Sequence, residues 1–193
     1  TMKCDYKIVS NKIQNFNELN EIQDEGEQTG ALTNYLLAKY PQKQWVIDAG
    51  ALQMMDVPLI PKNAILTPHH KEFERLDSKE HFAAEHRCIV LLKGKEDIAF
   101  GPGGETRVIE GGNAGMTKGG TGDVLAGIIA GLAAQGLTPR DAAACGVYLH
   151  GVAGEIICNE KGNTGMLAGD LLPAIPQAIK KLKEGSASGS GSK

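Results

Sequence analysis

A glycine-rich loop that ends in an acidic residue is the strongest chemical signal in this sequence. Gly119, Gly120, Thr121, Gly122 and Asp123 stand directly before an apolar stretch with helical periodicity. Glycines let consecutive backbone N–H groups turn toward one point, and the amino end of a helix adds roughly half a positive charge there. Such a concavity binds a phosphate or a developing anion. The sequence therefore predicts a site for phosphate chemistry at this loop.

Asp123 falls in the first turn of that expected helix, beside the anion site. A carboxylate there can accept a proton from a substrate hydroxyl as the hydroxyl attacks a phosphorus atom. The structural alternative is that an acidic residue after a glycine-rich turn only caps a helix. The length of the loop pattern favours the catalytic interpretation. A Walker loop and a Rossmann element do not explain the loop, because their glycine, lysine and acidic spacings are missing.

Two further groups of polar residues follow apolar runs that look like strands. His69 and Glu72 lie in a Thr-Pro-His-His-Lys-Glu segment, and Lys93 and Lys95 flank a glycine after the next run. An open α/β sheet presents ligand groups at the carboxyl ends of its strands. His69 and Glu72 can therefore reach a substrate or a metal-bound water, and a lysine can meet a nucleotide phosphate. The alternatives are that Glu72 serves a helix dipole and that one lysine is only solvated.

A third candidate is the loop at residues 159–170, which contains several glycines and ends at Asp170. Glycines permit the close approach of a nucleotide base. Turn geometry with Asp170 as a helix cap explains the same residues more simply, and we favour that interpretation.

These candidates need a frame of alternating strands and helices. Compact apolar runs bounded by turn residues predict buried parallel strands, and a Gly-Pro-Gly-Gly turn between two β-prone segments predicts a hairpin. The expected strands are 45–47, 64–66, 89–92, 97–100 and 106–109, and the expected helices are 29–39, 121–135, 138–159 and 170–183, with a short amphipathic helix at 13–22. Gly127 and Gly131 share a face of the 121–135 helix, which predicts close packing there. The pattern indicates an α/β fold with an open, mostly parallel sheet flanked by helices.

Composition excludes several classes of function. The 193 residues carry a formal net charge of -3, and aromatic residues make up 5%. We therefore expect no nucleic-acid partner and no attraction to an acidic membrane. No apolar run is long enough to span a bilayer. The cysteines form no CxxC pair, and Cys88, Cys145 and Cys158 lie in apolar runs, which predicts buried free thiols and a cytoplasmic location.

We expect three segments along the chain. Residues 1–30 are polar and weakly patterned, residues 31–184 form the α/β domain, and residues 185–193 have the composition of a flexible linker or tag. Thr1 before Met2 is typical of a cloning remnant.

Two stretches resemble the signatures of a known family. Residues 67–73, Thr-Pro-His-His-Lys-Glu-Phe, resemble its TPHPGE-type motif, and residues 113–132, NAGMTKGGTGDVLAGIIAGL, closely resemble its NPGMATGGTGDVLTGIIAGL signature. Residues 165–176 resemble its closing helix. On these motifs, the chain is identified as a member of the ATP/ADP-dependent NAD(P)H-hydrate dehydratases, a branch of the ribokinase-like superfamily. The resemblance covers roughly residues 44–182.

The resemblance implies a repair reaction. A hydroxyl added to the nicotinamide ring of NADH or NADPH would be phosphorylated from ATP or ADP, and loss of phosphate would restore the ring double bond. By motif, Asp123 would be the base and would contact the hydrate, and His69 would contact the dinucleotide. Gly120, Thr121 and Gly122 would form the anion hole. The resemblance assigns the adenine nucleotide to Lys93, Gly94, Lys95, Glu96, Asp97 and Gly122. Mg²⁺ would be held through phosphates, with Glu72 orienting a water.

The sequence departs from the family at its amino-terminal side. Members usually begin with further βα units and a GPGLG-type loop, which residues 2–30 do not resemble, and His70-Lys71 replaces Pro-Gly. Two alternatives therefore stay open beside the dehydratase: a small-molecule kinase of the same superfamily, acting on a vitamin precursor or a sugar, and a non-catalytic nucleotide-binding fragment that needs a partner chain. A sheet edge left open predicts a homo-oligomer.

Overall fold

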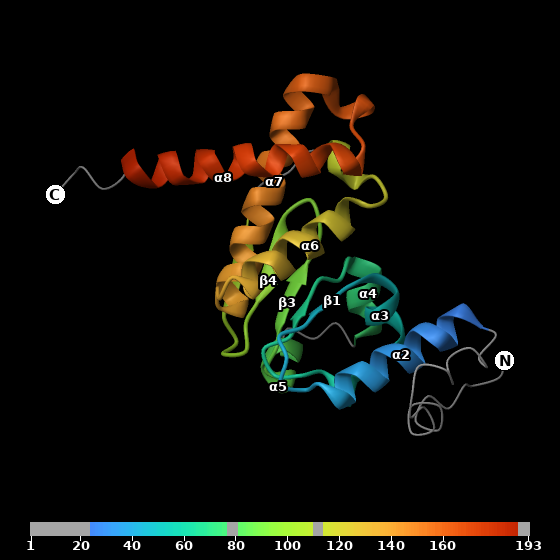
Figure 1. Cartoon of the computed structure of the whole chain (residues 1–193). Coiled ribbons are helices and arrows are strands. Elements are labelled where there is room, and N and C mark those ends of the chain that lie inside the picture. The colour runs from blue at the N-terminus through green and yellow to red at the C-terminus, as the bar shows by residue number, and fades with distance from the viewer. Residues whose placement is uncertain (1–23, 77–80, 110–113, 189–193) are drawn as a thin grey trace. The chain divides into compact units, whose positions relative to one another are not determined.

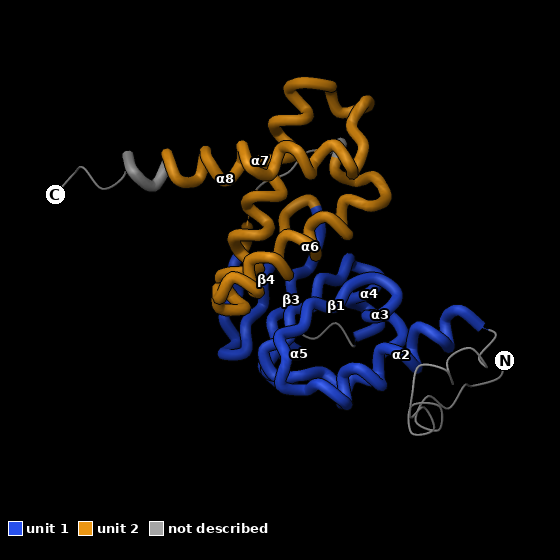
Figure 2. The backbone as a smooth tube through the Cα atoms, in the orientation of Figure 1, with its two compact units in different colours: residues 1–94, 98–107 blue, residues 95–97, 108–193 orange. Residues whose placement is uncertain are grey.

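The structure is a computed structural model, and it describes residues 24–76, 81–109 and 114–188. The chain divides into two compact units, shown in different colours in Figure 2. The first comprises residues 1–94 and 98–107, and the second comprises residues 95–97 and 108–193. The chain therefore passes between the units three times: after Gly94, after Asp97 and after Arg107.

A five-stranded sheet with the order β1-β2-β3-β4-β5 forms the frame of the first unit. The strands are β1 (Val46–Ile47), β2 (Ile65–Leu66), β3 (Ile89–Leu92), β4 (Asp97–Phe100) and β5 (Thr106–Ile109). The first three are parallel, and β4 runs antiparallel to β3. The expected strands and the hairpin are confirmed, with β1 and β2 each one residue shorter than predicted. The sheet is mixed, because the hairpin adds antiparallel strands to a parallel set.

The helical elements of the first unit are α2 (Glu25–Lys39), α3 (Ala49–Met54), η2 (Val57–Leu59), α4 (His70–Arg75) and α5 (Phe82–His86) (Figure 1). Helix α2 begins four residues earlier than predicted. Asp24 Oδ1 accepts a hydrogen bond from the Glu27 N–H at 2.9 Å, and Glu25 and Glu27 place negative charge in the first turn. An N-cap and acidic first-turn residues both stabilise a helix start. The amphipathic helix expected at 13–22 lies outside the described residues.

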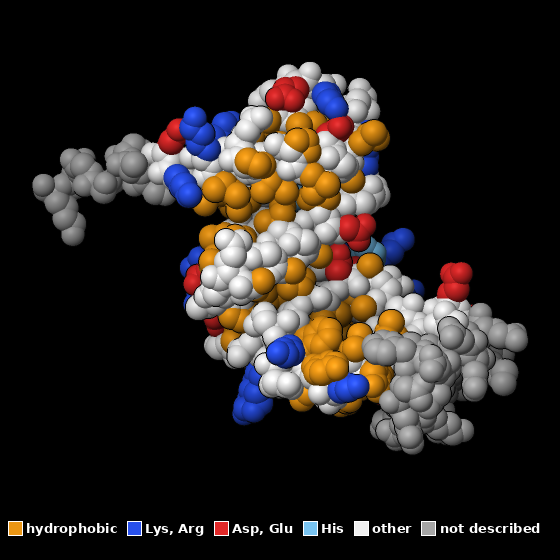
Figure 3. All heavy atoms as spheres, in the orientation of Figure 1, with side chains coloured by type: hydrophobic (Ala, Val, Ile, Leu, Met, Phe, Trp, Pro, Cys, Tyr) orange, Lys and Arg blue, Asp and Glu red, His pale blue; other side chains and the backbone are white. Residues whose placement is uncertain are grey.

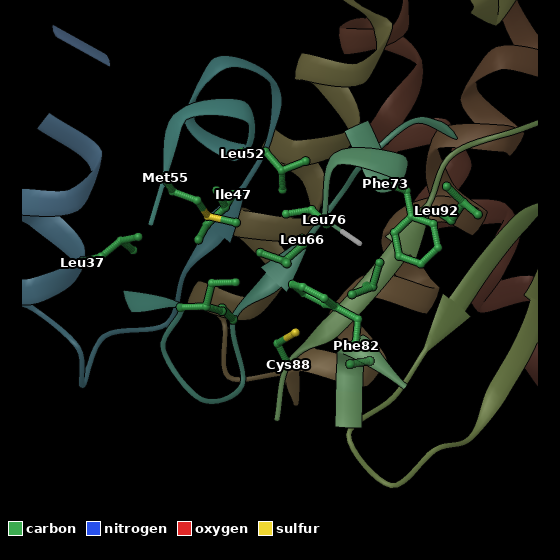
Figure 4. Close-up of a cluster of buried hydrophobic side chains, with 14 residues drawn as sticks. Leu37, Ile47, Leu52, Met55, Leu66, Phe73, Leu76, Phe82, Cys88 and Leu92 are labelled. Carbon is green, nitrogen blue, oxygen red and sulfur yellow. The ribbon is translucent and has the colours of Figure 1, made fainter. Parts of the chain in front are cut away.

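The core of this unit lies between the parallel strands and the short helices that follow them (Figure 4). Leu66 and Val90 on neighbouring strands are 0% exposed, and Phe73 of α4 stacks on Phe100 with a 5.7 Å centroid separation. Cys88 is also buried here, and burial raises the pKa of its thiol to about 12. Apolar runs in parallel strands are buried on both faces, which is why the sequence pattern identified them.

The second unit is helical and contains η3 (Ala114–Thr117), α6 (Thr121–Ala134), α7 (Pro139–Gly165), η4 (Ala168–Asp170) and α8 (Leu171–Ser188). The predicted starts of α6 and α7 are confirmed. Thr138 caps α7 by accepting from the Asp141 N–H at 3.2 Å, with Pro139 as its first residue. Helix α7 extends beyond the predicted end, but Gly162 interrupts it at φ 75° and ψ 162°. Helix α8 also continues past the predicted end to Ser188.

Helix α7 is the centre of this unit. It packs against α6 and α8, and its inward side carries a buried cluster with Leu149, Ala153 and Ile156. A Cβ on Gly146 would overlap Ile129 of α6, and a Cβ on Gly154 would overlap the Met116 side chain. These two glycines are therefore the points of closest approach. The close packing predicted at Gly127 and Gly131 is wrong within the described residues, since no described atom lies within 4 Å of a Cβ placed there.

The three described cysteines have no disulfide partner, in agreement with the sequence. Cys88 is buried, but Cys145 and Cys158 are partly exposed, so the expected burial is wrong for those two. No helix in the described ranges combines the length and the apolar character that crossing a membrane requires.

The core position of Leu66 gives a test of the first unit. Leu66→Ala removes apolar surface at a site that is 0% exposed, so it should lower the free energy of unfolding by about 2–5 kcal/mol in a urea titration. Val108→Ala is the control, because Val108 is 53% exposed and its loss should change the same quantity by about 0.5 kcal/mol or less. Equal effects of the two substitutions would contradict the assigned core.

Candidate active site

The carboxyl ends of β2 and β3 bring two of the predicted groups together. His69 and Lys93 form an isolated parallel bridge just beyond the strands, and the Lys93 N–H donates to the Pro68 carbonyl at 2.8 Å. Parallel pairing of β2 with β3 continues into this bridge. The first unit therefore presents His69 and Lys93 side by side at one edge of its sheet, as expected for ligand groups of an open α/β sheet.

His69 and Glu72 form a reciprocal cap at the start of α4. The Glu72 N–H donates to His69 Nδ1 at 3.1 Å, and the His69 N–H donates to Glu72 Oε2 at 2.9 Å. Gln53 Nε2 donates to the other Glu72 oxygen at 3.0 Å. The Glu72 side chain is 5% exposed, whereas that of His69 is 52% exposed. Since Nδ1 accepts, a neutral His69 carries its proton on Nε2 and can donate it to a ligand.

Lys93 is paired within the protein. Its Nζ lies 2.7 Å from Asp48 Oδ1, and the two side chains are 22% and 12% exposed. Asp48 directly follows β1 and precedes Ala49, which has a left-handed backbone at φ 50°. A non-glycine residue in this conformation is uncommon and costs conformational energy. The turn after β1 thus holds the Asp48 carboxylate against Lys93. Beyond Lys93, the residues Gly94, Lys95 and Glu96 are exposed.

The glycine loop of the second unit has the geometry that its sequence requires. Gly120 is the N-cap of α6 at φ 90°, and a Cβ on it would lie 3.0 Å from the Ala168 Cβ. A side chain is therefore disfavoured both by the backbone conformation and by the available space. Thr121 Oγ1 lies 2.7 Å from the Met116 carbonyl and 2.8 Å from the Lys118 carbonyl, so its hydroxyl closes the turn before the helix.

Asp123 is exposed in the first turn of α6, three residues after the left-handed glycine. It also lines an apolar groove of about 500 Å³. The other lining residues are Val124, Gly127, Ile128, Gly131, Leu132 and Gln135 of α6, Leu149 of α7, and Leu172, Ile175 and Ile179 of α8. Figure 3 shows hydrophobic side chains gathered between α8 and α6. A carboxylate at the rim of an apolar groove is placed to meet a partly apolar ligand that carries a hydroxyl.

The predicted site residues fall into two groups. His69, Glu72, Lys93 and Gly94 belong to the first unit, and the second unit contains the exposed pair Lys95 and Glu96, Asp97, and the loop with Gly120, Thr121, Gly122 and Asp123. Across the described ranges, no group of three or more His, Cys, Asp or Glu side chains is arranged to hold a metal ion.

Three side chains in and around the candidate site make contacts that were not anticipated from the sequence. Asp48 pairs with Lys93, Gln53 binds Glu72, and Lys118 Nζ donates to the carbonyls of Thr164 and Met166. The sequence could have identified Asp48 as a candidate site residue, because it follows an apolar run just as Lys93 does. No local sequence pattern predicted the roles of Gln53 and Lys118, because each binds a residue that is distant in the sequence.

Comparison with known proteins gives a consistent result. The model of a family described as NAD(P)H-hydrate dehydratase matches residues 22–177. A bifunctional NAD(P)H-hydrate repair enzyme of Moorella thermoacetica is 39% identical over 157 residues, which cover 72% of this chain and 30% of the relative. An ADP-dependent (S)-NAD(P)H-hydrate dehydratase of Xanthomonas campestris is 34% identical, covering 72% of this chain and 53% of the relative.

Solved structures agree with the sequence relatives. An ADP/ATP-dependent NAD(P)H-hydrate dehydratase from Bacillus subtilis, co-crystallised with ATP and Mg²⁺, is 32% identical with a TM-score of 0.62 over 70% of this chain and 54% of that one. A ribokinase-like superfamily protein of Enterococcus faecalis has a TM-score of 0.67 and 28% identity over 83% of this chain and 60% of that one. The ribokinase-like fold is confirmed. The chain spans about half the length of the dehydratases that it matches.

The Lys93–Asp48 pair can be tested by a double-mutant cycle. Asp48→Asn leaves a partly buried ammonium without its counter-charge and should lower the free energy of unfolding by about 1–3 kcal/mol, less than for a fully buried pair. Lys93→Met in the Asp48→Asn background should recover part of that loss, because no unpaired charge remains. Urea titration of the four proteins gives the coupling energy. Strictly additive effects would contradict the pairing.

Proposed function

Since this chain belongs to the NAD(P)H-hydrate dehydratase family, we propose that it serves the dehydration of hydrated NADH and NADPH, driven by ATP or ADP. The observation that carries the proposal is the loop at the start of α6, where a left-handed Gly120 precedes an exposed Asp123 by three residues. This is an anion site with a carboxylate beside it. The family match covers residues 22–177 and includes that loop.

Asp123 is the proposed base. Its carboxylate accepts the proton of the ring hydroxyl while the hydroxyl oxygen attacks the terminal phosphorus of the nucleotide, and the shortened nucleotide leaves. The bond between the ring carbon and the ester oxygen then breaks, inorganic phosphate leaves with the bonding electrons, and loss of a proton from the neighbouring ring carbon restores the double bond. Phosphorylation thus turns a hydroxyl, which is a poor leaving group, into a good one.

Gly120, Thr121 and Gly122 form the proposed anion hole. The first N–H groups of an α-helix have no acceptor within the helix, and at α6 they follow a glycine that has no side chain to cover them. The Thr121 N–H also has a long contact of 3.4 Å to the Lys118 carbonyl, which a bound anion would replace. Donors fixed in this way stabilise charge on the transferring phosphoryl group without reorganising.

The proposed ligand contacts of the first unit are at the sheet edge. His69 would donate from its exposed imidazole to the dinucleotide, and Lys93 and Gly94, with Lys95, Glu96, Asp97 and Gly122 of the second unit, would hold the adenine nucleotide. Lys93 would approach a phosphate while paired with Asp48. That pairing lowers the net positive charge at the sheet edge.

The residues fit a Mg²⁺ ion that is bound chiefly through nucleotide phosphates. The described residues contain no three-ligand protein cluster, and Mg²⁺ commonly keeps its waters and uses few carboxylates beside phosphates. Glu72 would act only through a water, because both of its oxygens already accept hydrogen bonds and its side chain is 5% exposed. The ion would supply charge neutralisation between the phosphates.

We further propose a cytoplasmic protein that self-associates. The described thiols are unpaired, which suits a reducing compartment. β1 and β5 are the edge strands of the sheet, and most of β5 is exposed. Exposed edges favour pairing with another copy.

The enzymatic test uses hydrated NADH with ATP and ADP in parallel. The chain should release phosphate and restore NADH absorbance, and Asp123→Asn should lower the turnover rate about 10²-fold or more, because the base is lost. Asp141→Asn is the matched control, since Asp141 occupies the same position in the first turn of α7, where it accepts from Thr138 Oγ1 at 2.6 Å. A stable phosphorylated alcohol as product would instead support a small-molecule kinase. Absence of turnover by the chain alone, with activity after a partner chain is added, would support a fragment that needs a partner.

Self-association is tested by native mass measurement. We expect dimers or larger assemblies at micromolar concentration, and a purely monomeric protein would contradict the proposed homo-oligomer.

A further inference from the structure

Lys118 stands two residues before Gly120, yet its ammonium binds the carboxyl end of another helix. Its Nζ donates to the Thr164 carbonyl at 2.7 Å and to the Met166 carbonyl at 2.7 Å. The last carbonyls of a helix lack N–H donors within the helix and carry partial negative charge. The regular part of α7 ends at Gly162, whose backbone is not helical, shortly before these two carbonyls. A lysine at this place satisfies two main-chain oxygens with one charge.

The charges around this lysine come from the same turn. Lys161 Nζ lies 2.6 Å from Asp170 Oδ1, and the Leu167 N–H donates to Asp170 Oδ2 at 2.9 Å. The Lys161 ammonium and then the Leu167 hydrogen bond hold the pKa of Asp170 below its usual value, with a smaller contribution from the charge of Lys118. Lys161 and Lys118 thus both stabilise the turn at 164–168, but only Lys118 is directly joined to the glycine loop, because it precedes Gly119.

The glycine loop is held from other directions as well. Met116 fills the space above Gly154, and the Thr121 hydroxyl lies within hydrogen-bond distance of the carbonyls of Met116 and Lys118. The Ala168 Cβ faces Gly120. The stretch from Met116 to Thr121 is therefore seated between α7 and η4, and the Lys118 side chain is the polar link between the loop and the 164–168 turn.

We propose that Lys118 is a positioning residue, which fixes the anion-binding loop against the 164–168 turn and so aligns the backbone N–H groups of Gly120, Thr121 and Gly122 on the phosphoryl group. The inference rests on the proposed function for its kinetic consequence. Lys118 acts through main-chain carbonyls and not as a phosphate ligand, because its donors are directed to Thr164 and Met166. The remaining contacts keep the loop folded when the lysine is lost, but they do not fix its alignment.

The experiment compares Lys118→Met with Lys118→Arg and Lys161→Met. Lys118→Met should lower kcat about tenfold or more and change KM for the nucleotide less than about threefold, because misaligned donors weaken stabilisation of the transition state most. Lys118→Arg keeps a cation that can reach both carbonyls and should restore kcat to within about threefold. Lys161→Met loosens the same turn without touching the loop and should leave kcat within about twofold.

Several results would overturn the inference. Unchanged kcat in Lys118→Met would do so, as would an equal loss in Lys161→Met, which would mean that the turn matters only for stability. A rise of about tenfold in KM with kcat retained would identify Lys118 as a direct phosphate ligand instead.

Hydrogen exchange separates this inference from the proposed function. Lys118→Met should speed amide exchange about tenfold or more at Thr121 and Val124, whose N–H groups donate to the carbonyls of Lys118 and Gly120, and Lys161→Met should not. If the unaltered chain does not dehydrate hydrated NADH, the proposed function fails while this exchange difference still supports the positioning role. Equal exchange in the two variants would refute that role whatever the activity.

Discussion

The proposed active site depends on one constraint at the start of α6: the residue before the helix must have no side chain that would cover the first N–H groups. Gly120 satisfies this constraint with a left-handed backbone at φ 90°, and Ala168 fills the space that a Cβ would occupy. The neighbouring helix α7 then holds the residues that precede Gly120. Helix α7 supports Met116 at Gly154, and its carboxyl end binds Lys118. The conformation of the loop thus depends on contacts with α7 and with Ala168, as well as on its own sequence.

The first unit holds the charged groups of Lys93 and Glu72 just beyond the ends of its buried strands. The central strands β2 and β3 are apolar and buried, so the polar groups stand at their ends. Each is matched by a partner of the same unit: Lys93 by Asp48, and Glu72 by the His69 backbone and Gln53. Partly buried charges require such compensation. The exposed imidazole of His69 is the group that this network leaves facing solvent.

Much of this fold could be predicted because its signals are local. Buried parallel strands give short apolar runs, and β3 was located to the residue at Ile89–Leu92. Thr138 and Pro139 marked the start of α7 through capping chemistry. The start of α2 was misplaced because Asp24 lies in a polar stretch without apolar periodicity. The glycine motif identified the loop, but the roles of Lys118 and Asp48 depend on residues 46 and 45 positions away in the chain, which no local pattern records.

The described cysteines of the two units differ in how readily a reagent in solution reaches them. Cys88 lies on the innermost part of the first unit, and its thiol has a pKa of about 12, so at neutral pH it is almost entirely protonated as well as shielded. Cys145 and Cys158 are partly exposed on α7 of the second unit. Among the described cysteines, an alkylating reagent therefore reaches Cys145 and Cys158 in the native state and reaches Cys88 only when the first unit opens. The rate of Cys88 modification would then report the free energy of that opening, with no label introduced.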